Sequence, residues 1–172
     1  LLSGTAKPAG MAGAARVPVP LCFHKLAACR QTGAMVITNI SAVRAEFGRY
    51  RRLLELAVEQ VDEAAFYEPV GPDGNSIAVI VQHLTGNLRS RFTDFLSSDG
   101  EKPWRKRDGE FEEPPRDRAA LLEKMESAWG VLDSALDAVA RQDAWLQVVT
   151  IRKQPLSVME ALYRSLVWRG LI

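Results

Sequence analysis

Apolar residues recur at helical spacing through most of the chain after residue 38, and this periodicity restricts the fold more than any other feature. In residues 39–61 they stand three or four positions apart, which is typical of a helix with one buried face. Similar segments run over residues 77–95, 117–139 and 157–167, and the predicted buried faces include Phe47, Leu88, Leu132, Met159, Leu162, Tyr163 and Leu166. The sequence therefore predicts an all-α protein, a four-helix bundle with longer connections after its second and third helices.

Residues suited to cap a helix stand at the predicted starts of the last three segments. Asn75 or Ser76 precedes the second segment, and Asp117 precedes the third. Side-chain oxygens at such positions accept hydrogen bonds from free backbone N–H groups. Ser157 and Glu160 have the spacing of a capping box, in which both ends of the motif bond the first turn.

Two connecting segments differ from the helices in composition. Residues 101–115 mix both charges with three prolines, so we expect a long loop packed by Trp104 and Phe111, and loops of that length are often functional. Residues 145–152 are rich in β-branched side chains. This segment is too short and solitary for a sheet, so we predict an extended connector.

The bulk composition favours a soluble, cytoplasmic protein without a nucleic-acid partner. A chain of 172 residues with 47% hydrophobic content fits one globular domain, and its formal net charge is only +1. Nucleic-acid binders usually carry a large basic excess. No apolar run approaches the ~20 residues that span a membrane. The two cysteines, Cys22 and Cys29, both lie near the start, which suits a reducing compartment.

Residues 1–36 differ in kind from the rest, and we expect a disordered or non-native leader before a domain at residues 37–172. The first acidic residue is Glu46, and prolines and glycines interrupt any helical period. Two alternatives stay open. Residues 26–29 resemble a lipoprotein cleavage box, although His24 and Lys25 interrupt the required apolar stretch. Cys22, His24 and Cys29 offer soft metal ligands, although their spacing matches no common zinc motif.

Four sequence strings resemble the DinB-like superfamily of helical-bundle metalloproteins, in an uncharacterised bacterial branch. They are NSIAVIVQHL at residues 75–84, GNLRSRF at 86–92, DGEKPWR at 99–105 and RDGEF at 107–111. The likeness covers roughly residues 37–167. The strings EKPWR and RDGEF are its most specific part, because neither packing nor helix propensity demands them.

The resemblance implies a divalent metal, zinc, nickel or iron, held by three histidines. His83 matches the first ligand, whereas a lone helix histidine could equally bond a backbone carbonyl or water. The other two ligands form an H-x-x-x-H pair in the family, where this chain has Trp168 and Ile172. Since stable catalytic sites use about three protein ligands, the chain as written is expected to bind metal weakly or not at all. A frameshift, a truncation and a true loss all stay open as explanations.

The resemblance also implies the activity. Some members of the superfamily transfer low-molecular-weight thiols, so we expect a thiol-transferase type of enzyme acting on a small-molecule or thiol substrate and left incomplete by the missing histidines. Asn87 is predicted to orient that substrate, and Trp104 and Arg107, with Arg105, to close over the cavity mouth, although such residues are commonly solvated. Glu112 and Glu113 are assigned no acid or base role.

The alternative is a non-catalytic helical interaction protein. The predicted fourth helix is truncated at about 15 residues, or ~22 Å, against ~33 Å for the first helix. A shorter helix leaves part of the groove between its neighbours uncovered. Exposed apolar surface of that kind favours self-association, so we expect a homodimer.

Overall fold

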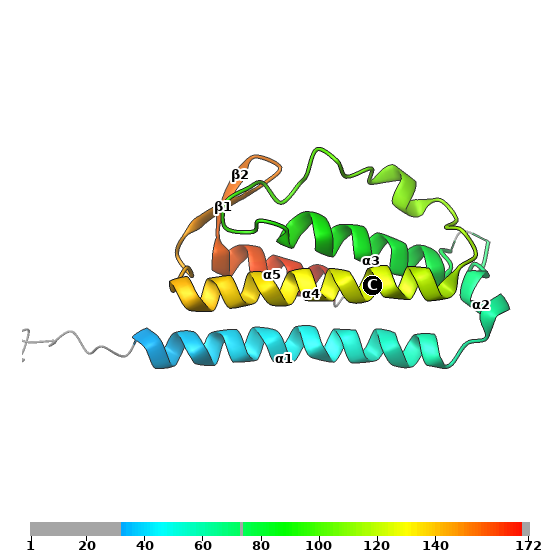
Figure 1. The fold of residues 1–172 in the computed structure, drawn as a ribbon, viewed down its shortest axis with the longest axis horizontal. Coiled ribbons are helices and arrows are strands. Elements are labelled where there is room, and N and C mark those ends of the chain that lie inside the picture. The colour runs from blue at the N-terminus through cyan, green and yellow to red at the C-terminus, as the bar shows by residue number, and fades with distance from the viewer. Residues whose placement is uncertain (1–31, 73, 170–172) are drawn as a thin grey trace, which may run out of the picture. The chain divides into compact units, whose positions relative to one another are not determined.

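A computed structural model describes residues 32–72 and 74–169, all within one compact unit of the chain, and it confirms the all-α prediction in the main. Side chains are described for residues 39–72 and 74–167. The described residues form five α-helices, a short 3-10 helix and one two-stranded sheet (Figure 1). In chain order these elements are α1 (Thr32–Glu59), α2 (Glu63–Tyr67), α3 (Ile77–Phe92), η1 (Asp108–Phe111), α4 (Arg118–Gln142), β1 (Val148–Ile151), β2 (Gln154–Ser157) and α5 (Val158–Arg169).

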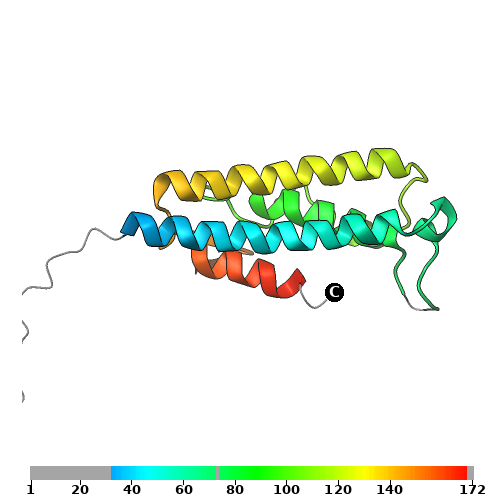
Figure 2. The same ribbon diagram turned by 90° about the horizontal axis from the view of Figure 1, so that it is seen from below.

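The predicted apolar stripes form the core between the longer helices. α3 packs mainly against α4, and α1 packs against both α4 and α5 (Figures 1 and 2). Phe47 of α1, Leu88 of α3 and Leu132 of α4 are each at most 2% exposed. Burying a side chain of this size is worth ~1.5–3 kcal/mol. The periodicity therefore located the interior faces of α1, α3 and α4 correctly.

The predicted caps are present where the backbone needs them. The Ser76 side chain accepts a hydrogen bond from the Val79 N–H at 3.1 Å, and Asp117 accepts one from the Ala120 N–H at 2.9 Å. Ser157 and Glu160 form the predicted capping box, with bonds of 3.2 and 2.9 Å. These bonds fix where α3, α4 and α5 begin.

The segment predicted as an extended connector is instead half of a β-hairpin. β1 pairs antiparallel with β2, and Val149 faces Leu156 on the buried side. The two-residue turn consists of Arg152 and Lys153, whose φ angles are 54° and 62°. Two successive left-handed residues make the type of turn that matches the twist of a hairpin. The prediction was wrong because this turn lacks the glycine or asparagine that usually marks it.

The loop before α4 is held by polar groups more than by its aromatic residues. Trp104 and Phe111 are 51% and 46% exposed, so the predicted packing by these rings is only partial: Phe111 lies against the ring of His83, and Arg89 lies over that of Trp104. Gln82 of α3 donates hydrogen bonds to the backbone carbonyls of residues 109, 110 and 112 at 3.2, 3.2 and 2.9 Å. This amide fixes η1 against α3.

The predicted buried face of α5 is correct in part. Leu162 and Leu166 are buried as predicted, together with Val158, whereas Met159 and Tyr163, which were also predicted to face the core, are 36% and 53% exposed. α5 has 12 residues against 28 in α1. A helix of so few turns offers few apolar positions from which to determine its phase.

Predictions for the first 31 residues, including those on Cys22, His24 and Cys29, lie outside the described residues, as does most of the predicted leader. The side chain of Trp168 and all of Ile172 lie outside them as well. Among the described helices none is both long and apolar enough to cross a membrane.

Candidate functional site

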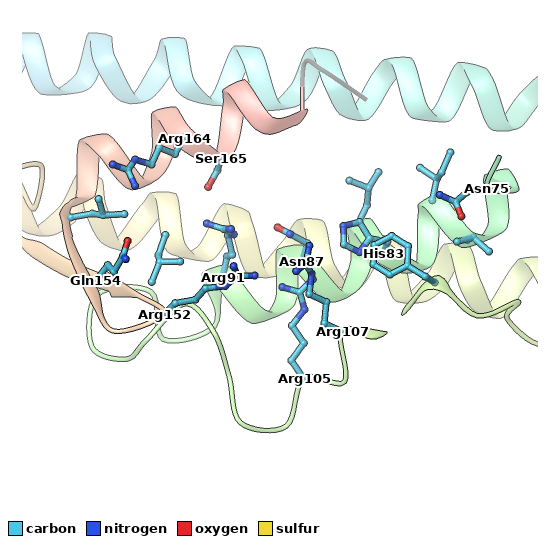
Figure 3. Close-up of a pocket in the computed structure, with 16 residues that line it drawn as sticks. Asn75, His83, Asn87, Arg91, Arg105, Arg107, Arg152, Gln154, Arg164 and Ser165 are labelled. Atoms are coloured by element: carbon cyan, nitrogen blue, oxygen red, sulfur yellow. The ribbon is translucent and has the colours of Figure 1, made fainter. Parts of the chain in front are cut away.

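A cavity of about 690 Å³ lies between α3, the loop that carries η1, the hairpin and α5 (Figure 3). This volume is in the range of small-molecule sites. Its apolar lining residues are Val79, Ile80, Leu84, Phe111, Ile151 and Leu156. Its polar lining residues are Asn75, His83, Asn87, Arg91, Arg105, Arg107, Arg152, Gln154, Arg164 and Ser165. No carboxylate is found among these lining residues.

His83 is held in the wall of this cavity by a buried carboxylate and an aromatic ring. Its Nδ1 lies 3.0 Å from Oε2 of Glu110, and its ring is tilted by 31° against Phe111 with the centroids 4.5 Å apart. A neutral histidine whose Nδ1–H donates to a carboxylate keeps its lone pair on Nε2. The contact with Glu110 therefore assigns Nε2 as the ring atom able to accept a proton or bind a ligand.

Glu110 is fixed in turn by Arg105. The guanidinium donates through Nε to Oε1 and through Nη2 to Oε2, both at 2.7 Å. The Arg105 side chain is 3% exposed and that of Glu110 is 10% exposed. Two parallel bonds of this kind set the orientation of a carboxylate as well as its charge. Arg105, Glu110 and His83 thus form one chain of hydrogen-bonded groups, which we call the His83 triad.

The triad fits against α3 only because residue 86 is glycine. A Cβ at Gly86 would lie 2.1 Å from Oε1 of Glu110, well inside contact distance. Glycine inside a helix costs ~1 kcal/mol relative to alanine. The close approach of the carboxylate to the backbone accounts for a glycine in the middle of α3.

Burial lowers the pKa of His83 from its ordinary value of 6.5, and the neighbouring Glu110 opposes this only in part. Arg105 and Arg107 lower the pKa further. His83 is therefore neutral at pH 7. A neutral imidazole is the form that acts as a base or as a metal ligand.

Arginines dominate the charged lining of the cavity. Figure 3 shows Arg91, Arg105 and Arg107 gathered near Asn87, between His83 and the hairpin residue Arg152. Arg105 and Arg152 both contact Glu101, at 3.7 and 3.2 Å. Within the described part of the chain, the side chain of Arg91 makes neither a hydrogen bond nor an ion pair.

The hairpin wall of the cavity is tied to the loop after α3 by Asp99. Its carboxylate accepts hydrogen bonds from the backbone N–H groups of Arg152 at 2.9 Å, Lys153 at 2.7 Å and Glu101 at 2.7 Å. Partial burial raises the pKa of Asp99, but these backbone bonds outweigh it and lower the pKa from 3.8 to about 2. Asp99 thereby stabilises the two left-handed turn residues.

The structure brings four of the five predicted site residues together. His83, Asn87, Arg105 and Arg107 line the cavity, whereas Trp104 is exposed outside its lining, with the Arg89 guanidinium 5.8 Å from its ring centroid. Sequence reasoning missed Glu110 and Arg91. The glycine three residues after His83 was the available signal, because an isolated helix glycine can mark a close approach.

The described residues do not fit the three-histidine metal centre that the resemblance implies. His83 is the only histidine among them. No group of three or more histidine, cysteine, aspartate or glutamate side chains in residues 39–72 and 74–167 is arranged to hold a metal ion. The nearest carboxylate, Glu110, is already bonded to Nδ1 of His83 and to Arg105. The chemistry of the site is therefore derived from the chain's own residues.

Fold and site together define a helical protein in which the partly buried His83 lies in the wall of an arginine-lined, small-molecule-sized cavity. The chain belongs to the family described as "Protein of unknown function (DUF1572)", whose profile matches residues 35–170. DUF1572 is a DinB-like family, so the resemblance is confirmed at that level. Comparisons with curated proteins and with solved structures found no significant match.

Proposed function

We propose that this protein is a thiol-transferase type of enzyme that uses His83 as its proton acceptor, and that α1, α3, α4 and α5 correspond to the four helices of a DinB-like bundle. The observation that carries the proposal is the His83 triad in the cavity wall. It supplies a neutral imidazole with a defined tautomer beside a space large enough for a small organic substrate. A cytoplasmic location is part of the same proposal.

The step assigned to His83 is proton removal from a thiol bound in the cavity. Nε2 accepts the proton from sulfur, the thiolate forms a bond to an electrophilic carbon, and the leaving group departs with the electron pair of its former bond. Since the thiolate is the nucleophilic form, the rate at neutral pH depends on the removal of this proton. Asn87, one turn beyond His83 on α3, is assigned to orient the substrate.

The test measures conjugation of cysteine and of glutathione to chlorodinitrobenzene by absorbance. We expect a rate above the uncatalysed reaction, and a loss of roughly 10²–10⁴-fold in His83→Gln, because general base catalysis is worth about that much. Arg141→Ala is the control, since Arg141 is exposed in the last turn of α4 and does not line the cavity. Equal rates for the wild type and His83→Gln would remove His83 from the reaction.

Metal binding by His83 stays a prediction that elemental analysis can test. The purified protein and His83→Ala are compared for zinc, nickel and iron after dialysis. Less than one metal ion per chain in the wild type is the expected result, since catalytic sites use about three protein ligands. A full equivalent of metal in the wild type that His83→Ala lacks would show that residues outside the described part complete a site.

Self-association is a second candidate function, and one observation favours it. Met159, Tyr163 and Val167 stand four residues apart on α5, so they share one face of the helix, and they are 36%, 53% and 61% exposed. We infer that this apolar stripe pairs two copies of the chain in a homodimer. Exposed apolar stripes on surface helices commonly form the contacts between helical proteins.

Light scattering on a size-exclusion column tests the dimer over a range of concentrations. Tyr163→Glu is expected to give monomers, because it introduces a charge into the centre of the stripe. Leu146→Glu is the matched control, since Leu146 is 80% exposed and lies outside α5. A wild type that stays monomeric at high concentration would contradict this proposal.

A further inference from the structure

We propose that the arginine end of the cavity is an oxyanion-binding subsite centred on Arg91, and that the substrate carries a carboxylate or phosphate group there. The proposal rests on the proposed function only in assuming that the same cavity holds the substrate. Anion binding can be measured without any reaction, so the two proposals fail separately.

The first observation is the lack of a counter-charge for Arg91. This side chain is partly buried in the cavity wall, yet no described residue gives it a hydrogen bond or an ion pair. The charged groups that act on it most strongly are Arg105, Glu101, Arg152 and Arg107, three cations against one carboxylate. A partly buried cation among like charges destabilises a fold unless an anion joins it.

The second observation is that the two nearby carboxylates, Glu110 and Glu101, bind residues other than Arg91. Glu110 is bonded to Arg105 and to His83, and Glu101 lies within ion-pair distance of Arg105 and Arg152. Neither acid bonds Arg91. The lining thus holds five arginines, and the two acids behind it serve other partners. An oxyanion from outside the chain completes this arrangement, and the guanidinium fork binds carboxylate and phosphate oxygens in pairs.

The order of residues along α3 indicates what the rest of the ligand is like. Val79 and Ile80 are followed by His83 and Leu84, then Asn87, and finally Arg91, all of them in the cavity wall. Eight residues separate His83 from Arg91, or about 12 Å along the helix axis. The expected substrate is therefore an extended organic anion with an apolar part near His83.

Burial lowers the pKa of Arg91, with Arg105, Arg152 and Arg107 acting in the same direction and Glu101 in the opposite one. Arginine stays protonated at neutral pH even so. A bound oxyanion relieves this repulsion, which gives the subsite an electrostatic reason to bind.

Calorimetric titration of the full chain with inorganic phosphate and with succinate tests the subsite. The wild type is expected to bind at least one probe, and the preferred probe identifies the group as phosphate or carboxylate. Arg91→Met is expected to bind roughly 10- to 100-fold more weakly, because a hydrogen bond to a charged group is worth ~1.5–3 kcal/mol. Arg91→Lys is expected to fall between the two, since it keeps the charge but loses the fork. Arg141→Met is the control and is expected to bind as the wild type does.

Urea unfolding gives the second readout and separates binding from structure. Without anion, Arg91→Met is expected to be at least as stable as the wild type, because it removes a cation that no described residue pairs. With phosphate or succinate, only the wild type and the control are expected to gain stability. The proposal is overturned if neither probe binds the wild type, if Arg91→Met and Arg141→Met bind equally well, or if Arg91→Met is less stable than the wild type without anion.

Discussion

Arginines occur on two sides of this protein in different surroundings. On the surface formed by α1 and α4, Arg44 pairs with Asp137 and lies 3.5 Å from Asp133, and Arg51 lies 2.6 Å from Glu126. These pairs are largely exposed to solvent. Such contacts between exposed groups contribute ~0–1 kcal/mol each.

Around the cavity the arginines outnumber the acids, since five of them line it and two described acids, Glu101 and Glu110, contact them. Arg105 is almost completely buried and depends on Glu110, while Arg91 has neither a hydrogen bond nor an ion pair within the described chain. The pairs on α1 and α4 can be lost at little cost, whereas loss of the buried Arg105–Glu110 pair is expected to cost several kcal/mol. This contrast fits the proposal that the cavity charges bind a ligand, whereas the α1–α4 pairs add at most modest stability.

Removing one acid from each side of the protein is expected to give the largest difference in stability. Glu110→Gln leaves the buried Arg105 guanidinium without its two charged bonds, and breaking a buried pair in this way costs about 3–5 kcal/mol. Glu126→Gln removes one of the two acidic partners of the half-buried Arg51, which keeps Glu55, and is expected to cost under ~1 kcal/mol. Both free energies of unfolding are measured with urea. Equal losses would show that the two sides do not differ as described.

A smaller loss of stability is expected when Asp99, which holds the hairpin wall of the cavity, is replaced. Asp99→Asn weakens three backbone hydrogen bonds and is expected to cost ~1–3 kcal/mol, against little for Asp133→Asn on the other side. Because the pKa of Asp99 is lowered, its contribution is complete above pH 3.8 and is lost as the pH falls toward about 2. The gap between the wild type and Asp99→Asn should therefore close in acid. A gap that is the same at pH 7 and in acid would exclude this role.

The features that the sequence predicted are those set by neighbours along the chain. Helix faces and caps depend on residues three or four positions apart, which explains why the buried positions Phe47 and Leu132 and the caps Ser76 and Asp117 were found. The hairpin depends on a contact of longer range. Arg152 and Lys153 take left-handed conformations because a carboxylate more than fifty residues earlier binds their N–H groups.

The candidate site was found in part for the same reason. His83 was identified from its resemblance to a family motif, but its partner Glu110 stands 27 residues later, among other acids that differ little in sequence. In the sequence Arg91 looks like any polar residue of a helix. Its lack of an acidic partner becomes visible only in the structure, where Glu101 binds Arg152 and Glu110 binds Arg105. Long-range pairing of charges is not encoded in any local spacing.

Replacing one glycine on each side of the protein tests the same difference, with expected changes in the free energy of unfolding of about 1 kcal/mol. Gly130→Ala on α4 adds a Cβ where no atom lies within 4 Å, so it is expected to stabilise the protein by ~0.5–1 kcal/mol through helix propensity. Gly86→Ala on α3 adds the same Cβ against Glu110 and is expected to destabilise it instead. Thermal unfolding of both variants checks the opposite signs. If Gly86→Ala were stabilising as well, the tight fit of Glu110 on α3 would be wrong.

The smallest effect concerns the titration of His83. Its pKa is lowered in the folded protein, so the unfolded chain binds more protons below pH 6.5, and stability should fall as the pH drops through 6.5 toward the folded pKa. Glu110 raises this pKa, so Glu110→Gln should lower it further, and Glu126→Gln should leave it unchanged. Titration by NMR can follow the ring protons of His83 through this range in all three proteins. A pKa that rises in Glu110→Gln would show that the carboxylate does not hold the Nδ1 proton, and the assignment of Nε2 as proton acceptor would be lost with it.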